Sequence, residues 1–223
     1  MKKALLSLFA LAATIGTASA QVEIGLKVSP AITSLRAESA SAYGFDSDGS
    51  QLGFSGGLVV DYFFGENYAF STGLQLAGKG GTIRYRENPN ATLNSIKLTT
   101  QYLEVPISVK LFTNEIATAT RLYFQVGGSL NVPIGSRIGG SKFYRDPATN
   151  IENKAGDYVY FIDADALVAA GAEYTLGQST KLFAGLGYHR GLVDIDHYFE
   201  HNRSFSDVTI KNSSFGLDLG IKF

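Results

Sequence analysis

The sequence contains no cysteine and no tryptophan, and only one methionine. Without cysteine, the chain cannot form a disulfide, bind a metal through thiolates or carry a lipid on a cysteine behind an export signal. Its 19 Lys and Arg residues face 20 Asp and Glu residues, so no basic excess favours nucleic acid as a partner. These absences exclude nucleic-acid binding, thiol chemistry and lipoprotein anchoring.

The amino terminus has the layout of a secretory signal peptide. Two lysines follow Met1, an apolar run continues to about residue 17, and the small residues Ala18-Ser19-Ala20 close the segment. Export signals that are cleaved after crossing the membrane have this order of basic, apolar and small residues. We therefore predict a signal peptide over residues 1–20 and one domain over residues 21–223.

Beyond this segment, long hydrophobic runs are absent. No run approaches the roughly 18 apolar residues of a spanning helix, and an exported membrane protein without such helices can satisfy its backbone only as a closed barrel. Eight segments alternate apolar and polar residues with a period of two, as strands between two environments do. They lie at residues 22–36, 51–64, 68–86, 97–112, 121–137, 157–176, 180–196 and 207–223. The prediction is an all-β fold, an eight-stranded antiparallel up-and-down transmembrane β-barrel in the outer membrane.

The connections between these segments alternate in length. Short turns fall at 65–67, 114–120 and 177–178, and long loops fall at 37–50, 87–95, 138–156 and 197–205. Outer-membrane barrels have short periplasmic turns and long extracellular loops. The loop at 138–156 is the longest and mixes aromatic with basic residues, so it is the first candidate for contact with a partner or an anionic glycolipid.

Charges avoid one face of each segment, and we assign the charge-free face to lipid. In 97–112, for example, Val105 and Ile107 lie on one face, and Glu104 and Lys110 lie on the other. Since eight strands enclose only enough room for side chains, inward charges are expected to pair with one another as a plug. A proton or small-ion path is the alternative. The predicted lumen charge network is Glu23, Lys27, Asp61, Lys79, Glu104, Lys110, Asp163, Asp165, Glu173, Asp218 and Lys222.

The last strand carries a predicted assembly signal. Its lipid-side residues alternate without interruption and end on an aromatic carboxy terminus: Phe215, Leu217, Leu219, Ile221 and Phe223. We expect this face to contact outer-membrane lipid and to be read by the barrel-assembly machinery during insertion.

The sequence also predicts where two sets of aromatic residues lie in the barrel and where one strand has a bulge. The first group is expected to form an interfacial girdle at the short-turn end, and comprises Tyr62, Phe64, Tyr68, Phe70, Phe112, Tyr123, Phe124, Tyr174, Phe183 and Phe223. The second lies at the loop end, and comprises Tyr43, Phe45, Tyr85, Phe143, Tyr144, Tyr158, Tyr198 and Phe199. The alternation changes phase across Gly80-Gly81, which predicts a bulge there.

Three features resemble the PorT-type family of small outer-membrane β-barrel proteins. They are the segment Val22-Glu23-Ile24-Gly25-Leu26-Lys27 after the export signal, the stretch Tyr102-Leu103-Glu104-Val105-Pro106-Ile107, and the terminal Phe223. The resemblance implies an eight-stranded membrane barrel. It says little about activity, because only some members are linked to protein secretion or gliding machinery.

A catalytic interpretation rests on histidines and acids near the outer rim. His197 to His201 spell H-x-x-E-H, which a zinc peptidase needs on a helix, but the segment is expected to be a loop with no helix. The residues Asp163, Asp165, Asp194, Asp196, His189 and His197 could in principle assemble there to activate water.

We therefore predict a non-enzymatic barrel with a plugged polar lumen and surface loops for binding an envelope or extracellular protein. No cofactor is expected. An accessory subunit of a secretion or gliding apparatus and an outer-rim hydrolase or lipid A-modifying enzyme are the alternatives.

Overall fold

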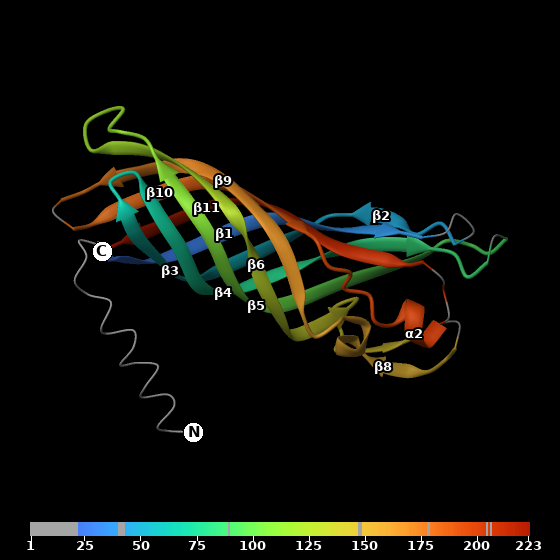
Figure 1. The fold of residues 1–223 in the computed structure, drawn as a ribbon. Helices are drawn as coiled ribbons and strands as arrows, with labels where there is room; N and C mark the ends of the chain where they lie inside the picture. The colour runs from blue at the N-terminus through green and yellow to red at the C-terminus, as the bar shows by residue number, and fades with distance from the viewer. Residues whose placement is uncertain are drawn as a thin grey trace, which may run out of the picture.

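The computed structural model describes residues 22–39, 43–88, 90–146, 149–177, 179–203, 205 and 207–223. The predicted signal peptide lies outside these residues. Eight long strands form the body of the molecule (Figure 1). They are β1 (Val22–Glu38), β3 (Gln51–Gly65), β4 (Tyr68–Tyr85), β5 (Asn94–Phe112), β6 (Thr120–Ile138), β9 (Asp163–Thr175), β10 (Lys181–Gly191) and β11 (Thr209–Lys222).

These strands close into an antiparallel barrel. Each long strand pairs with its neighbours in chain order, and the first pairs with the last, with Leu26 opposite Ile221 and Ile32 opposite Phe215. Closure pairs the backbone groups of both edge strands, so no long strand is left with an open edge. The predicted fold class is confirmed.

The sixth and seventh predicted strands are too long. The predicted segment 157–176 is a strand only from Asp163, and 180–196 ends as a strand at Gly191. The first residues of the former instead complete a 3-10 helix, η1 (Ala155–Tyr158). Apolar residues alternate there because some of them pack into the outer end of the barrel, as Tyr158 and Ile195 do.

The long loops contain further structure at the outer end (Figure 1). The short strand β2 (Asp46–Gly49) pairs with the outer end of β4. The hairpin of β7 (Phe143–Arg145) and β8 (Glu152–Lys154) and the helix α2 (Phe199–Arg203) lie in the two loops beyond β6 and β10. Among the described residues, no helix is long and apolar enough to cross a membrane.

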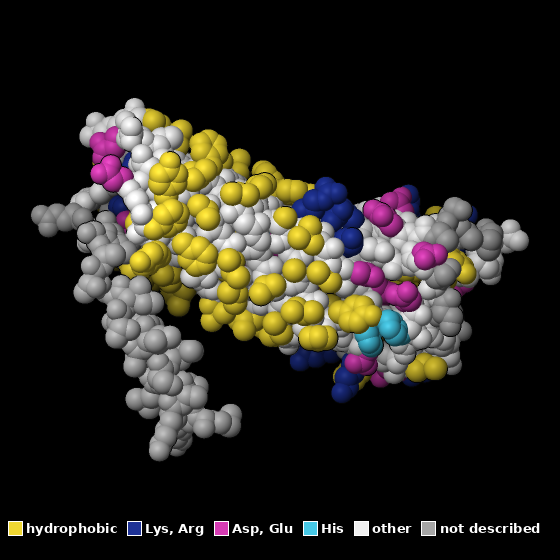
Figure 2. All heavy atoms as spheres, in the orientation of Figure 1, with side chains coloured by type: hydrophobic (Ala, Val, Ile, Leu, Met, Phe, Trp, Pro, Cys, Tyr) yellow, Lys and Arg dark blue, Asp and Glu magenta, His cyan; other side chains and the backbone are white. Residues whose placement is uncertain are grey.

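The outward face carries a broad hydrophobic band (Figure 2). On β5, Ile107 and Leu111 are exposed, whereas Glu104, Ser108 and Lys110 are buried in the lumen. The predicted assignment of faces is therefore confirmed for this strand.

The aromatic girdle is partly wrong. Phe64, Tyr68, Phe70, Phe124, Tyr174 and Phe223 are exposed on the outer wall. In contrast, Phe112, Tyr123 and Phe183 point inward and pack with Val59, Phe63 and Ala69. These three residues lie at positions of their strands that alternate inward, and their large rings fill the lumen near the short-turn end.

The predicted bulge at Gly80-Gly81 is also wrong. Both glycines keep the regular pairing of β4 with β5, opposite Thr99 and Leu98. The register instead shifts in the pairing of β5 with β6, where Tyr102 lies opposite Pro133 and Gln101 opposite Gly135. Proline has no N–H for the ladder, which suits it to a bulge.

A close approach explains Gly80 instead. Its φ of +146° favours glycine, and a Cβ there would lie 2.1 Å from the carbonyl oxygen of Leu98. Near this level of β4 the interior of the barrel changes from charged to apolar. Ile83 and Tyr85 lie on the same inward face as Lys79, but they pack into an apolar cluster.

Candidate functional site: the lumen network and the outer cap

Charged side chains near the short-turn end of the lumen form one connected group. Lys222 lies at its centre, with its Nζ 2.5 Å from Asp61 Oδ2, paired with Glu173 and 3.8 Å from Glu23 Oε2. Lys110 Nζ lies 2.9 Å from the same Asp61 carboxylate. Since these groups are nearly all buried, each charge depends on its neighbours for solvation.

A second charged group lies further along the lumen. Lys79 Nζ lies 2.8 Å from Glu104 Oε2 and 2.7 Å from Asp165 Oδ2. Asp165 also accepts hydrogen bonds from Ser129 at 2.5 Å and Asn131 at 2.9 Å. Its Oδ1 lies 2.9 Å from His189 Nδ1.

We use the name lumen network for both charged groups together. All eleven residues of the predicted lumen charge network point into the lumen. Asp163 forms no ion pair with any cation among the described residues, but it accepts a hydrogen bond from Asn212 at 2.9 Å. Lys27 is partly exposed, and its Nζ lies 3.5 Å from Asp218 Oδ1.

Sequence reasoning omitted three members of the lumen network. Arg121 lies 3.6 Å from Glu173, Lys181 pairs with Glu23, and His189 contacts Asp165. The period-two alternation that predicts the other members also predicts these three, because each lies at an inward position of its strand.

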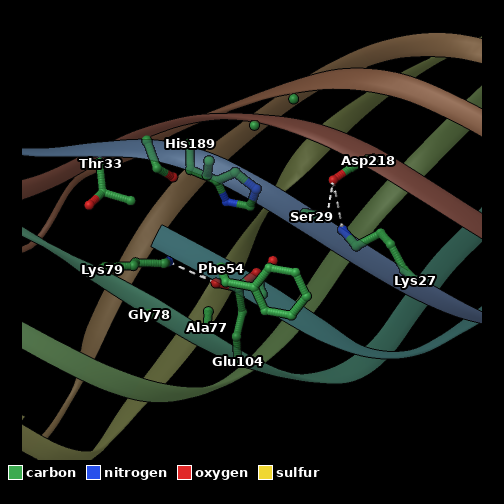
Figure 3. Close-up of a pocket in the computed structure, with 15 residues that line it drawn as sticks. Lys27, Ser29, Thr33, Phe54, Ala77, Gly78, Lys79, Glu104, His189 and Asp218 are labelled. Carbon is green, nitrogen blue, oxygen red and sulfur yellow. Dashed lines mark hydrogen bonds and ion pairs between the residues drawn. The ribbon is translucent and has the colours of Figure 1, made fainter. Parts of the chain in front are cut away.

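Little free space remains between these side chains. A cavity of about 30 Å³ and another of about 10 Å³ are lined by Lys27, Glu104, His189 and Asp218, among others. Figure 3 shows the first, with Lys79 beside Glu104 and with Lys27 and Ser29 turned toward Asp218. Such volumes hold about one to three water molecules.

Three lumen residues could in principle hold a cation. Glu104, Asp165 and His189 offer ligand atoms within 4.8 Å of one another. However, the ammonium group of Lys79 already contacts both carboxylates. A lysine at that position supplies the positive charge that a metal ion would bring.

The outer end of the lumen is filled by a hydrophobic cluster, which we call the outer cap. It combines strand residues with residues of three long loops: Leu35, Ala37, Phe45, Ile83, Tyr85, Ile96, Leu98, Ile138, Ala155, Tyr158, Val159, Ile195, Tyr198, Phe199, Phe205, Val208 and Ile210. Tyr43 and Tyr144 pack against it. Of the eight aromatics predicted for the loop end, five thus belong to this core, two pack against it, and Phe143 remains exposed.

Polar contacts anchor the loops over the outer cap. Arg203 pairs with both Asp146 and Glu87, so that it joins three loops. The hydroxyl of Tyr198 donates a hydrogen bond to Asp146 at 2.8 Å. These buried contacts fix the position of α2 relative to the β7–β8 loop.

Asp196 caps the amino end of α2. Its carboxylate accepts hydrogen bonds from the backbone N–H groups of Tyr198, Phe199 and Glu200 at 3.1 to 3.2 Å. Burial raises the pKa of Asp196 to about 6, and the nearby Asp194 acts in the same direction.

The H-x-x-E-H segment is not the plain loop that the sequence predicted. It lies within the longer loop 192–208, and α2 begins at Phe199. The rings of His197 and His201 stack with centroids 5.1 Å apart, and both contact the ring of Tyr160 edge-on. The described residues place no third metal-ligating side chain with this pair.

An open groove of about 580 Å³ lies beside these rings, and we call it the rim groove. Aromatic and amide side chains line it, including Tyr160, Phe161, His197, Asn153 and Asn202. Phe161 is 77% exposed. The groove therefore offers an accessible aromatic surface with polar groups at its edge.

The candidate catalytic residues do not meet in one place. Asp165 and His189 lie in the lumen, where Asp165 is paired with Lys79. Asp194 and Asp196 accept backbone hydrogen bonds in the loop after β10. His197 lies in the rim groove, so the set forms no common acid–base site.

Comparison with known proteins identifies the barrel. A family model described as "Outer membrane protein beta-barrel domain" matches residues 16–197. No curated protein matches the sequence. Among solved structures, Neisserial surface protein A (NspA) is similar at a TM-score of 0.50 and 17% identity, covering 92% of this chain and 98% of that one.

Two further structures are similar at lower scores. OprG from Pseudomonas aeruginosa has a TM-score of 0.48 and 11% identity, with 91% of this chain and 95% of that chain covered. Ail of Yersinia pestis, solved with the heparin analogue sucrose octasulfate, has a TM-score of 0.40 and 13% identity, with 91% and 99% covered.

Proposed function

Because this chain belongs to the family of outer membrane protein beta-barrel domains, we propose that it is a closed, non-enzymatic barrel that displays a fixed binding surface outside the cell. The outer cap carries this proposal. Three long loops contribute side chains to one hydrophobic core that fills the mouth of the barrel. A core of this kind holds the loops in one arrangement, as a preformed binding surface needs.

The lumen network supports the closed state. Its carboxylates and cations pair with one another, and only small cavities remain between them. Opening a channel would separate buried charges from their partners, at a cost of several kcal/mol for each pair. In planar bilayers we therefore expect no large, stable conductance.

We place the binding surface at the rim groove, and an envelope or extracellular protein is the partner that fits it best. Exposed aromatic side chains with polar neighbours are typical of the residues that dominate protein–protein binding. Phe161 and Tyr160 provide the aromatic surface, and Asn153 and Asn202 lie at the edge.

The test is a pull-down under mild detergent with two variants. Phe161→Ser should abolish recovery of a partner in fixed ratio, whereas Phe143→Ser should retain it. Phe143 is a matched control because it is also exposed, but it lies on β7 outside the rim groove. Equal recovery with both variants would reject this groove as the binding surface.

The resemblance to PorT-type proteins supports a second role, as an accessory subunit of a secretion or gliding apparatus. In the structure, Tyr102, Glu104 and Pro106 of the resembling stretch point into the lumen. The stretch thus supplies part of the lumen network. Such a subunit should bring down other envelope proteins, and its gene deletion should change the set of secreted proteins.

We further propose that residues 1–20 are removed on export and that the outward face of β11 directs assembly. Phe215, Leu217 and Phe223 are exposed on this face. Phe223→Ala should reduce heat-modifiable folding in membrane fractions more than Phe124→Ala, a matched outward aromatic on β6. Lys222 is unsuitable as a neutral control, because it lies at the centre of buried ion pairs.

A further inference from the structure

Three cations gather on the outer wall where the lipid-facing band ends. On β1 the outward residues include exposed apolar side chains as far as Ile32, and Arg36 lies two outward positions further along. On β11 the apolar run ends at Phe215, and Lys211 lies beyond it; Arg190 lies at the matching level of β10. Figure 2 shows basic side chains at this boundary, with acidic ones further out.

The pairing of the strands brings these charges together. Arg36 lies directly opposite Lys211 in the ladder of β1 and β11. Arg190 lies opposite Ser213, one step along the same outward face from Lys211. Like charges directly opposite on one face destabilise an antiparallel pair. The arrangement is therefore unfavourable unless a negative group comes between them.

In the described part of the protein, the Asp194 carboxylate lies near enough to Lys211 for a favourable Coulomb interaction, but no carboxylate forms an ion pair with any of the three cations. Glu38 lies one step further out on β1, opposite Thr209, and makes no ion pair with the three.

One nitrogen of the Arg36 guanidinium group is held by a hydrogen bond, and another has no hydrogen-bond partner. Its Nη2 donates a hydrogen bond to the carbonyl oxygen of Gly191 at 2.7 Å, which holds it beside the end of β10. Its buried Nε has no hydrogen-bond partner.

The depth of the cluster identifies the source of the acceptor. The lipid-facing run of β1 extends from Val22 to Ile32, which matches the roughly 9–11 residues that a tilted strand needs to cross the hydrocarbon core. The three cations therefore lie at the level of the outer lipid headgroups. Phosphate is the anionic group that arginine binds best, through paired hydrogen bonds.

We propose that Arg36, Arg190 and Lys211 form a binding site for the phosphate group of an outer-leaflet lipid. The phosphate screens the opposed charges of β1 and β11, and its oxygens accept hydrogen bonds from the guanidinium groups. The site lies on the outer wall, so it is separate from both the lumen network and the rim groove.

The probe is phosphatidic acid in phosphatidylcholine vesicles. For the wild-type protein, native mass spectrometry should detect phosphatidic acid retained in preference to phosphatidylcholine. The double variant R36Q/K211Q should weaken this retention about tenfold or more, because the loss of even one hydrogen bond between charged groups weakens binding by about that factor. Arg137→Gln is the matched control, because Arg137 is exposed on the outward face of β6 opposite the neutral Thr99.

A single variant guards against a folding defect. In pure phosphatidylcholine, Lys211→Gln should unfold at the same temperature as the wild type or higher, because it removes the repulsion from Arg36. With phosphatidic acid present, it should gain less stabilisation than the wild type.

Three results would overturn the proposal. One is equal retention of phosphatidic acid by the wild type and the double variant. Another is an equal loss of retention in Arg137→Gln. The third is stabilisation by free glycerol phosphate as large as that by phosphatidic acid, which would assign the site to a soluble anion and not to a lipid.

Discussion

In the membrane half of the barrel, apolar side chains face outward and charged ones face inward, and in the outer half the same strands have the reverse arrangement. On β5, Ile107 faces lipid and Lys110 lies inside, whereas further along the same strand Ile96 lies inside and Lys97 is exposed. The strand keeps its alternation throughout. What changes is the surroundings, because the outer wall meets hydrocarbon in one half and water in the other.

The two halves therefore have different sources of stability. In the outer half, water surrounds the wall, and burial of apolar side chains in the outer cap stabilises the structure as in a soluble protein. In the membrane half, lipid already accommodates the outward apolar residues. The interior there depends on the pairing of buried charges, which makes it sensitive to the loss of any one partner.

The largest effect is expected from the centre of the lumen network. Lys222→Met leaves Asp61 and Glu173 without one of their cations. Loss of one partner of a buried pair costs about 3–5 kcal/mol. Urea unfolding in lipid vesicles should detect the loss.

Lys27→Met is the matched control, since among the described residues Lys27 has a single ion-pair partner, Asp218 at 3.5 Å, and Lys27 is partly exposed. Its effect should be clearly smaller. Equal destabilisation would mean that connectivity within the lumen network does not determine stability.

The outer half should respond to a cavity in its core. Phe199 is 2% exposed and contacts the rings of Phe45, Tyr85 and Phe205. Phe199→Ala should cost about 3 kcal/mol or more, confined to the outer half, and limited proteolysis should then cut the loop 192–208.

The barrel of this variant should keep its heat-modifiable migration. Phe143→Ala, at an exposed position, should change proteolysis little. If Phe199→Ala unfolds the whole barrel, the two halves are one cooperative unit and the comparison fails.

The third prediction uses one face of one strand. Ile107→Arg places a charge in the lipid-facing band and should cost about 2–4 kcal/mol on folding into vesicles. Gln101→Arg, on the same outward face but nearer the outer end, should stay within about 0.5 kcal/mol. A reversed order would place the membrane boundary elsewhere on β5.

The smallest effect concerns pH and the cap of α2. Burial raises the pKa of Asp196 to about 6. Its contribution to the stability of the folded cap is therefore fully present below its ordinary pKa near 4 and is lost as the pH rises through 6. Hydrogen exchange at the amides of Tyr198, Phe199 and Glu200, corrected for intrinsic rates, should be slower at pH 4.5 than at pH 7. Asp196→Asn should remove this difference, and a difference that persists would assign it to another group.

Much of the barrel was predictable from local patterns. Period-two alternation places Glu104 and Lys110 on one face and Ile107 on the other without knowledge of their neighbours, because a strand has only two faces. The alternation of short turns with long loops gave the up-and-down order for the same local reason. The same rule could have found Arg121, Lys181 and His189.

Local patterns were misleading where packing between distant segments decides. The alternation near Tyr158 and Ile195 predicts strand residues beyond the ends of β9 and β10, where the structure has loops. Loop residues that pack into a core also alternate between buried and exposed positions. The phase change at Gly80-Gly81 predicts a bulge, whereas the pairing with β5 is regular there. The interior changes from charged to apolar near these glycines, and the extra residue lies in β6.

The sequence alone determined the strands, their faces and the charges of the lumen, because these depend on residues two positions apart. Only the tertiary structure decided which charges meet, that three loops close the outer mouth, and that Arg36 lies opposite Lys211. These depend on register across barrel closure, between residues far apart in the chain, and no local pattern contains that information.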